Sequence, residues 1–95
     1  MVRQIESWSI VRGRVRAVAD DPERTNFRIV SLDVDAVDPV DGYAHALDTT
    51  ATSADIAVPR ETMEKLPLAA GESVQLEVRG TPRGLFAHPD RVTRL

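Results

Sequence analysis

The alternation of apolar and polar residues in short, separate runs restricts the fold of this chain more than any other feature. From Ile10 to Val18 ("IVRGRVRAV"), small or apolar residues occupy every second position and three arginines stand between them. Side chains of an extended strand point alternately to opposite faces, so this run predicts a strand with one buried and one solvated face. Gly13 inside it predicts a bulge or a sharp bend, which lets a sheet curl.

Two further runs alternate in the same way and are separated from the first by turn-forming segments. Residues 26–37 ("NFRIVSLDVDAV") set three apolar residues against a serine and two aspartates, and residues 74–79 ("VQLEVR") repeat the pattern. Each predicts a half-buried strand. The segments 19–24, 38–42 and 80–84 are rich in Gly, Pro and Asp, which favour reversals of the chain.

The remaining segments predict a third strand, a short helix and a final strand or two. Residues 43–47 ("YAHAL") are expected to continue extended, and residues 48–54 ("DTTATSA") form a loop because they are small, polar and aperiodic. A helix is predicted over residues 59–66, where Pro59 suits the first helical position and Lys65 the last turn. The segments "LFAH" and "RVTRL" near the end supply the last extended chain.

The expected order is therefore strand, strand, strand, short helix, strand, strand, in a single domain covering residues 1–95. This order predicts a mainly β protein, a five-stranded Greek-key barrel with one short helix between strands 3 and 4. The stretch 66–80 ("LPLAAGESVQLEVRG") resembles the junction between the helix and the fourth strand in OB-fold barrels. Residues 10–88 are also similar to the TOBE and Mop-type modules, a resemblance that implies an oxyanion ligand but carries no site residues over.

Composition narrows the functions that such a barrel can have. The 95 residues carry a net charge of -3, contain no cysteine, and are 42% apolar and 28% charged. The absence of cysteine excludes disulfides and a thiolate zinc site. The start "MVRQIESWSIV" lacks the apolar run of a signal peptide, and no eighteen consecutive residues are apolar, so we expect a cytoplasmic protein without a membrane partner.

The resemblance to OB-folds implies a ligand face across strands two and three, between the loops that join strands one to two and four to five. On that face Phe27 and Tyr43 are candidates for stacking bases. The candidates for holding phosphates are Arg12, Arg14, Arg16, Arg28 and Arg83. Two alternatives stand beside these roles: Phe27 and Phe86 fit the core if a bulge reverses the strand parity, and the arginines of the first strand fit ion pairs with Asp33 and Asp35.

No motif in the chain indicates catalysis or a metal. The acidic run "DVDAVDPVDG" fails the calcium-loop spacing, because Val37 stands at its fifth position and Ala44 at its twelfth. There is no G-x-S-x-G elbow, no phosphate loop and no dinucleotide fingerprint. We therefore predict a non-enzymatic module without a cofactor or metal.

The leading functional prediction is recognition of single-stranded nucleic acid, or of a protein associated with nucleic acid. The alternatives are a protein-interaction or oligomerisation module that pairs through an edge strand, and an oxyanion-binding module of the TOBE or Mop type. The sequence does not determine the oligomeric state.

Overall fold

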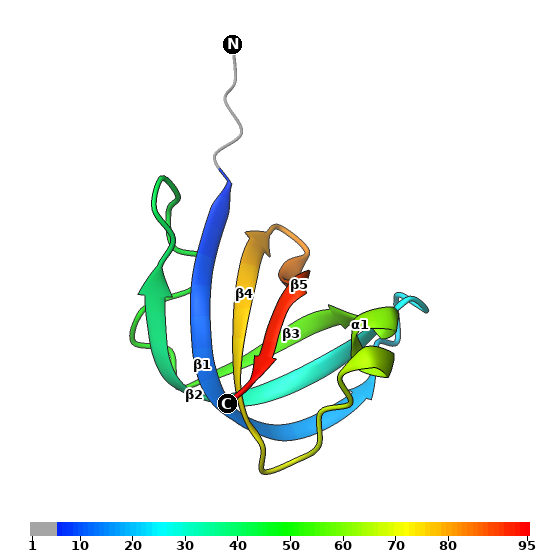
Figure 1. Cartoon of the computed structure of the whole chain (residues 1–95). Helices are drawn as coiled ribbons and strands as arrows, with labels where there is room; N and C mark the ends of the chain where they lie inside the picture. The colour runs from blue at the N-terminus through cyan, green and yellow to red at the C-terminus, as the bar shows by residue number, and fades with distance from the viewer. Residues whose placement is uncertain (1–5) are drawn as a thin grey trace.

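A computed structural model describes residues 6–95 of the chain, which form five β-strands and one short helix (Figure 1). In chain order the elements are β1 (Ser7–Asp20), β2 (Phe27–Pro39), β3 (Ser53–Pro59), α1 (Arg60–Lys65), β4 (Ser73–Thr81) and β5 (Gly84–Arg94). The mainly β class is confirmed, as is a single short helix between the third and fourth strands. Within the described residues, no helix has the length and apolar character that crossing a membrane would require.

The five strands close into a barrel in the order β1-β2-β3-β5-β4, with β4 returning to β1 (Figure 1). Every pairing is antiparallel except β3 with β5, which is parallel and joins only Ile56 to Leu85 and Ala57 to Phe86. This closed arrangement is compatible with the small OB-like barrel that the sequence predicted. The β3–β5 seam is the shortest of the five ladders.

The core lies inside the barrel and is built from alternate residues of the strands. β1, β2 and β4 bury the apolar positions that the sequence pattern predicted, and α1 adds Met63. Ala17 is the exception: the register shift after Val15 leaves it exposed, and Val18 packs against the core instead. Residues with no exposed surface include Val11, Val30, Leu32, Ile56, Val58, Val74, Leu76 and Val78. Burying one such side chain stabilises the fold by roughly 1.5–3 kcal/mol, and this burial is what fixes the register of each strand.

Gly13 marks a bend in β1, as expected. The pairing of β1 with β2 shifts register between Arg12 and Gly13, and again between Val15 and Ala17. A side chain at Gly13 would lie 3.3 Å from the Val34 Cα and deep inside contact distance of the Asp33 carbonyl oxygen. Only glycine therefore lets β2 pass this close to β1 at the first bulge.

The third strand and the helix start differ from the sequence prediction. Residues 43–47 do not form a strand; they belong to an irregular segment that contacts β1 through one bridge, at Ala44. The third strand is Ser53–Pro59 instead. Pro59 ends that strand and occupies the position before the helix, which begins at Arg60.

Candidate functional site

One row of directly opposed residues crosses all five strands on the outside of the barrel. Trp8 of β1 lies opposite Arg79 of β4, which lies opposite Phe86 of β5. Phe86 lies opposite Ala57 of β3, and Ala57 lies opposite Ile29 of β2. Residues directly opposite each other on paired strands point to the same face of the sheet. Both chain neighbours of Ala57 point into the core, so Ala57, and with it the whole row, points outward. Barrel closure thus places an indole, a guanidinium and a phenyl ring side by side.

Two adjoining hollows follow this row. The first, about 380 Å³ in volume, is lined by the end of β4 and the turn after it, including Arg79, Arg83 and Phe86. The second, about 350 Å³, shares Arg79 and Phe86 with the first and adds Trp8 and Phe27. We call the two hollows together the aromatic groove. Among the described residues that line it, two are arginines and none is a carboxylate.

Phe27 and Phe86 form one end of the aromatic groove. Their rings pack edge to face, with centroids 5.5 Å apart and an angle of 80° between the planes. Both residues are half-buried and neither belongs to the core cluster, so the alternative that a reversed parity turns them inward is wrong. Ala57 faces the same side and is nevertheless only 2% exposed, which indicates that the rings cover it.

Trp8 forms the other end of the groove. Its ring lies 6.3 Å from that of Tyr43, edge to face, and 5.9 Å from the imidazole of His88. The backbone N–H of Trp8 donates to the Ala44 carbonyl at 2.9 Å, which holds the segment carrying Tyr43 against β1. Tyr43 is 45% exposed. Three of the four aromatic residues, Trp8, Phe27 and Phe86, line the groove, and Tyr43 contacts it only through Trp8.

The β4–β5 turn presents Arg83 to the groove. The Thr81 hydroxyl accepts the backbone N–H of Arg83 at 3.1 Å and donates to the Gly84 carbonyl at 3.0 Å. Gly84 has φ 126°, a conformation that favours glycine, and its presence lets the chain reverse within two residues. Within the described residues the guanidinium of Arg83 forms no ion pair, so its charge is available to a ligand.

The β1–β2 loop is fixed by Asp21 and reaches Phe86 through Arg24. The Asp21 carboxylate accepts the Arg24 Nε–H at 2.8 Å and the backbone N–H groups of Glu23 and Arg24 at 2.9 and 3.2 Å. The hydrogen bond from the Arg24 side chain, followed by the backbone bond from Glu23, lowers the pKa of Asp21. The Arg24 guanidinium carbon then lies 4.6 Å from the centroid of Phe86, a cation–π contact.

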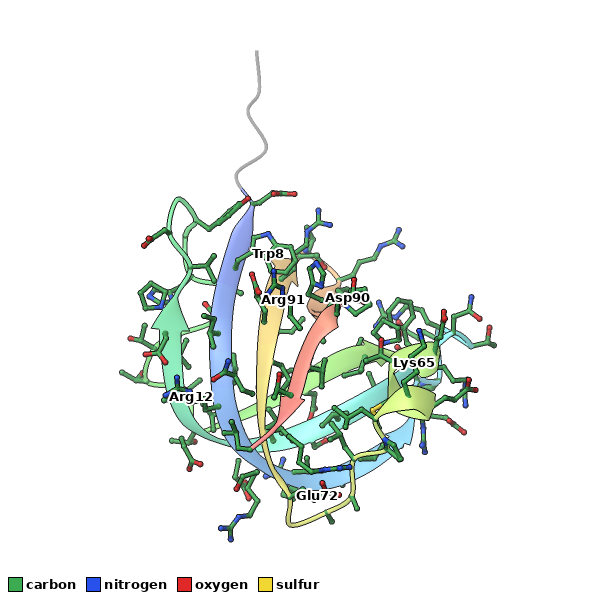
Figure 2. All side chains as sticks on the ribbon, in the orientation of Figure 1. Trp8, Arg12, Lys65, Glu72, Asp90 and Arg91 are labelled. Atoms are coloured by element: carbon green, nitrogen blue, oxygen red, sulfur yellow. The ribbon has the colours of Figure 1, made fainter. Side chains whose placement is uncertain are left out.

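The arginine ladder of β1 lies outside the aromatic groove. Arg12 donates from Nε to the Gln75 side chain at 2.8 Å, and Arg16 pairs with Asp33 at 3.4 Å. The alternative that these arginines pair with neighbouring carboxylates is therefore confirmed for Arg16. Arg14 is exposed and forms no ion pair within residues 6–95. Figure 2 shows Arg12 well below Trp8 on the barrel, so the ladder and the groove are separate surfaces.

Arg28, another candidate from the sequence, lies beside Asp20, but within the described residues its buried Nε–H has no hydrogen-bond acceptor. Its Nε lies 3.3 Å from the Asp20 carboxylate, which accepts a hydrogen bond from Arg60 at 3.0 Å. The structure thus brings two candidates, Phe27 and Arg83, into the lining of the groove and places Tyr43 behind Trp8. The other four candidate arginines lie outside it. Sequence reasoning missed Trp8 and Arg79 as site residues. The alternation of apolar and polar residues indicates which face of its strand such a residue occupies, but that these two residues are neighbours depends on the pairing of β1 with β4.

Ser9 and His45 form a second polar contact near Trp8. The Ser9 hydroxyl lies 3.0 Å from Nδ1 of His45 and accepts the backbone N–H of Ala46 at 2.9 Å. A serine beside a histidine is the arrangement of an activated nucleophile, but Ser9 has no exposed surface and no substrate can reach it. The pair instead anchors the segment that follows β2.

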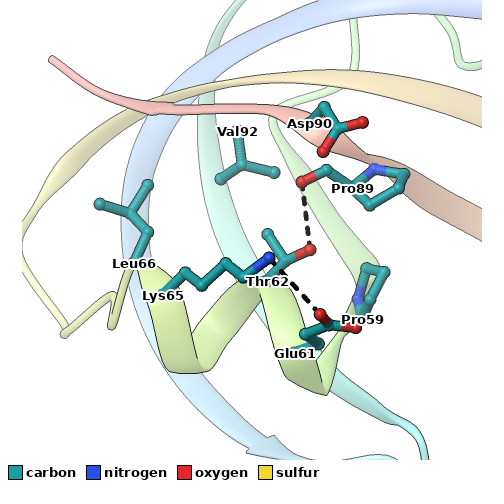
Figure 3. A pocket seen from close by; sticks show the side chains of 8 residues that line it. All are labelled: Pro59, Glu61, Thr62, Lys65, Leu66, Pro89, Asp90 and Val92. Atoms are coloured by element: carbon teal, nitrogen blue, oxygen red, sulfur yellow. Dashed lines mark hydrogen bonds and ion pairs between the residues drawn. The ribbon is translucent and has the colours of Figure 1, made fainter.

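A third hollow, about 250 Å³ in volume, lies between α1 and β5 (Figure 3). Most of its polar groups already bind one another: Lys65 pairs with Glu61 at 3.4 Å, and the Thr62 hydroxyl donates to the Pro89 carbonyl at 3.1 Å. Pro59 and Pro89 line both this hollow and the aromatic groove, and so form a wall between them. Within the described residues, no three His, Asp or Glu side chains come together to hold a metal ion.

Comparison with known proteins adds no family to this geometry. No protein-family model, no curated protein and no solved structure matches the chain. The closed barrel and the aromatic groove on its outer face are therefore the basis for a functional proposal.

Proposed function

We propose that this protein is a binding module that holds single-stranded nucleic acid in the aromatic groove. The observation that carries the proposal is the cross-strand row Trp8, Arg79 and Phe86. It alternates ring, guanidinium and ring, as a single strand alternates base, phosphate and base. Stacking of an unpaired base on an aromatic side chain contributes about 1–3 kcal/mol, and arginine binds phosphate through a planar pair of donors.

The spacing of the row supports this alternation. Adjacent strands lie about 4.8 Å apart, so the backbones of Trp8 and Phe86, two strands apart, are separated by roughly 10 Å. Two bases bound at the two ends of this row are splayed rather than stacked on each other, and the phosphate between them falls over Arg79. A paired duplex does not expose its base faces in this way, which favours an unpaired strand.

The local charge on the side of Arg79 and Arg83 also supports a polyanionic ligand, whereas Glu61 and Glu64 line a neighbouring hollow next to Phe27. The chain as a whole carries a net charge of -3, yet the groove contains Arg79 and Arg83 without a carboxylate in its lining. The nearest acidic partner of Arg79 is Glu6, at 3.9 Å, a contact at the limit of an ion pair between side chains that are each about half exposed. Such pairs contribute little and exchange easily for a phosphate.

The other functions predicted from the sequence have less support from the geometry. Pairing through an edge strand requires a free edge, and closure of the barrel removes most of the edges that an open sheet would offer. Oxyanion binding stays a prediction, since Thr81 is the one small hydroxyl residue among those that line the two hollows of the groove.

Trp8 is the only tryptophan of the chain and serves as an internal probe of the groove. The test is titration with oligothymidylate of about eight nucleotides, within the ~4–16 nucleotide site of one OB-fold. We expect quenching of Trp8 emission together with a rise in the fluorescence anisotropy of a labelled oligonucleotide. An unchanged emission and anisotropy at low salt would refute the proposal, and a stable dimer that ignores the oligonucleotide would favour a protein partner.

The salt dependence gives a quantitative form of the same test. Two groove arginines contacting phosphates predict a slope of log K against log salt of about -1.4, hence roughly sevenfold weaker binding from ~50 to ~200 mM salt. Replacing Arg79→Gln should reduce the slope to about -0.7. Arg14→Gln, an exposed arginine outside the groove on the neighbouring strand, is the matched control and should leave affinity and slope unchanged.

A further inference from the structure

The β1–β2 loop holds one guanidinium in a fixed place beside the aromatic groove. Three donors converge on the carboxylate of Asp21, two from the backbone and one from the Arg24 side chain. The Asp21 side chain is only 2% exposed and that of Arg24 is 28% exposed. The backbone N–H of Phe27 donates to the Arg24 carbonyl at 3.2 Å, so the loop is tied to the start of β2 as well. A long side chain that is normally mobile is therefore held in position before any ligand arrives.

This guanidinium limits which faces of the Phe86 ring a ligand can reach. The Arg24 Cζ lies 4.6 Å from the ring centroid, and the edge-to-face contact with Phe27 occupies a second side of Phe86. Ala57 lies beside Phe86 in the register of the barrel. A base cannot reach the ring face that Arg24 covers unless Arg24 leaves it. The Arg24 side chain is 28% exposed, so it is the group that a ligand meets over this face of Phe86.

We propose that the Arg24 guanidinium, positioned by Asp21 and lying over the Phe86 ring, is itself the plane on which an unpaired base stacks. This inference rests on the proposed function and specifies it. The groove then takes at least two unpaired bases, one on Arg24 and one beside Trp8 and His88, with the joining phosphate at Arg79. Bases stack on arginine planes as they do on aromatic rings, and the charge adds attraction for the adjacent phosphate. Arg24 contacts the ligand, and Asp21 is a positioning residue.

Replacing arginine by lysine distinguishes stacking of a base on Arg24 from simple attraction of a phosphate by its charge. Lysine keeps the positive charge but has no plane to stack on a base and cannot donate from Nε to Asp21 in the same geometry. If Arg24 stacks a base, Arg24→Lys should weaken binding of the eight-nucleotide oligothymidylate by roughly 5- to 150-fold, the range for one stacked base, with an unchanged salt slope. If Arg24 only attracts phosphate, the same variant should bind as the natural protein does.

The matched control is Arg16→Lys. Arg16 is an arginine paired with an aspartate, as Arg24 is, but it lies on the outer face of β1, and within the described residues it has no contact with an aromatic ring of the groove, whereas Arg24 lies over Phe86. We expect this control to bind like the natural protein. Urea denaturation of each variant checks that the fold is intact, and the emission of Trp8 without ligand checks the opposite end of the groove.

The role of Asp21 is tested by a double-mutant cycle. Asp21→Asn should weaken binding because Arg24 is no longer held in place, and the double variant with Arg24→Lys should lose no more affinity than Arg24→Lys alone. Additive losses would overturn the positioning role. If the natural protein and the Arg24→Lys variant bind the oligonucleotide equally well, this inference is wrong but the proposed function stands. If the natural protein does not bind the oligonucleotide, the proposed function itself is wrong.

Discussion

Replacing Gly13→Ala tests the bend of β1 on which the barrel depends. The added methyl group would lie 3.2 Å from the carbonyl carbon of Asp33 and 3.3 Å from the Cα of Val34, with the Asp33 carbonyl oxygen closer still. All three atoms are backbone of the paired strand, so no side chain can rotate away. Overpacking of a rigid site costs about 1–3 kcal/mol, and this contact belongs at the upper end of that range.

A smaller stabilising effect of the same substitution offsets part of this loss in the free energy of unfolding. Alanine restricts the unfolded chain more than glycine does, which stabilises a protein by about 0.4–1 kcal/mol where the native backbone tolerates it. The net loss is then about 2 kcal/mol. For a domain of this size, it corresponds to a melting temperature lower by about 8–16 °C, since each kcal/mol shifts it by roughly 4–8 °C.

Thermal denaturation followed by circular dichroism measures this loss directly. Arg14→Ala is the control because it changes the adjacent, exposed residue of the same strand, and it should alter stability by no more than about 0.5 kcal/mol. A Gly13→Ala variant as stable as the natural protein, or more stable, would show that β2 does not pass β1 at this distance. The register between the two strands would then be wrong.

Three further predictions concern the core, the β1–β2 loop and the anchor of the segment after β2. Leu32→Ala removes a side chain with no exposed surface and should lower the free energy of unfolding by about 2–5 kcal/mol in urea titrations. Because the pKa of Asp21 is lowered in the folded protein, its ionised carboxylate stabilises the fold fully above pH 3.8, its ordinary pKa, and this contribution disappears as the pH falls through the lowered pKa. Asp21→Asn should therefore make the melting temperature depend less on pH below pH 3.8. An unchanged dependence contradicts the assignment. Ser9→Ala leaves the Ala46 N–H without its acceptor and should cost about 1–3 kcal/mol and shift the emission of Trp8, whereas an unaltered spectrum and stability contradict the anchoring role.

Alternation in the sequence predicted the strands that bury one face and failed where both faces are covered. β1, β2 and β4 were located to within a few residues because their inward positions are apolar and their outward positions polar. In β3 the consecutive residues Ile56, Ala57 and Val58 are all buried, two by the core and one beneath the aromatic rings outside. Apolar and polar residues therefore do not alternate in this strand, and the sequence pattern placed the third strand at residues 43–47 instead.

The candidate site could be predicted only in part, because it is assembled by barrel closure. Phe27 and Arg83 were recognised from their place in the chain, next to the loops that an OB-like fold uses. Trp8 and Arg79 are about 70 residues apart and become neighbours only through the pairing of β1 with β4, which no local pattern reveals. The attraction of Arg16 for Asp33, by contrast, follows from opposite charges on adjacent strands and was predicted correctly.

The double pairing of β1 has a consequence for the chain as it is synthesised. Gly13 pairs with Val74, about 60 residues later, so at ~5–20 residues per second one edge of β1 waits roughly 3–12 seconds for its partner on the ribosome. During that interval an exposed strand edge invites association with other nascent chains. Arg12 and Arg14 lie along this unpaired edge, and we expect the repulsion between their charges to keep two copies of β1 apart until β4 pairs with it.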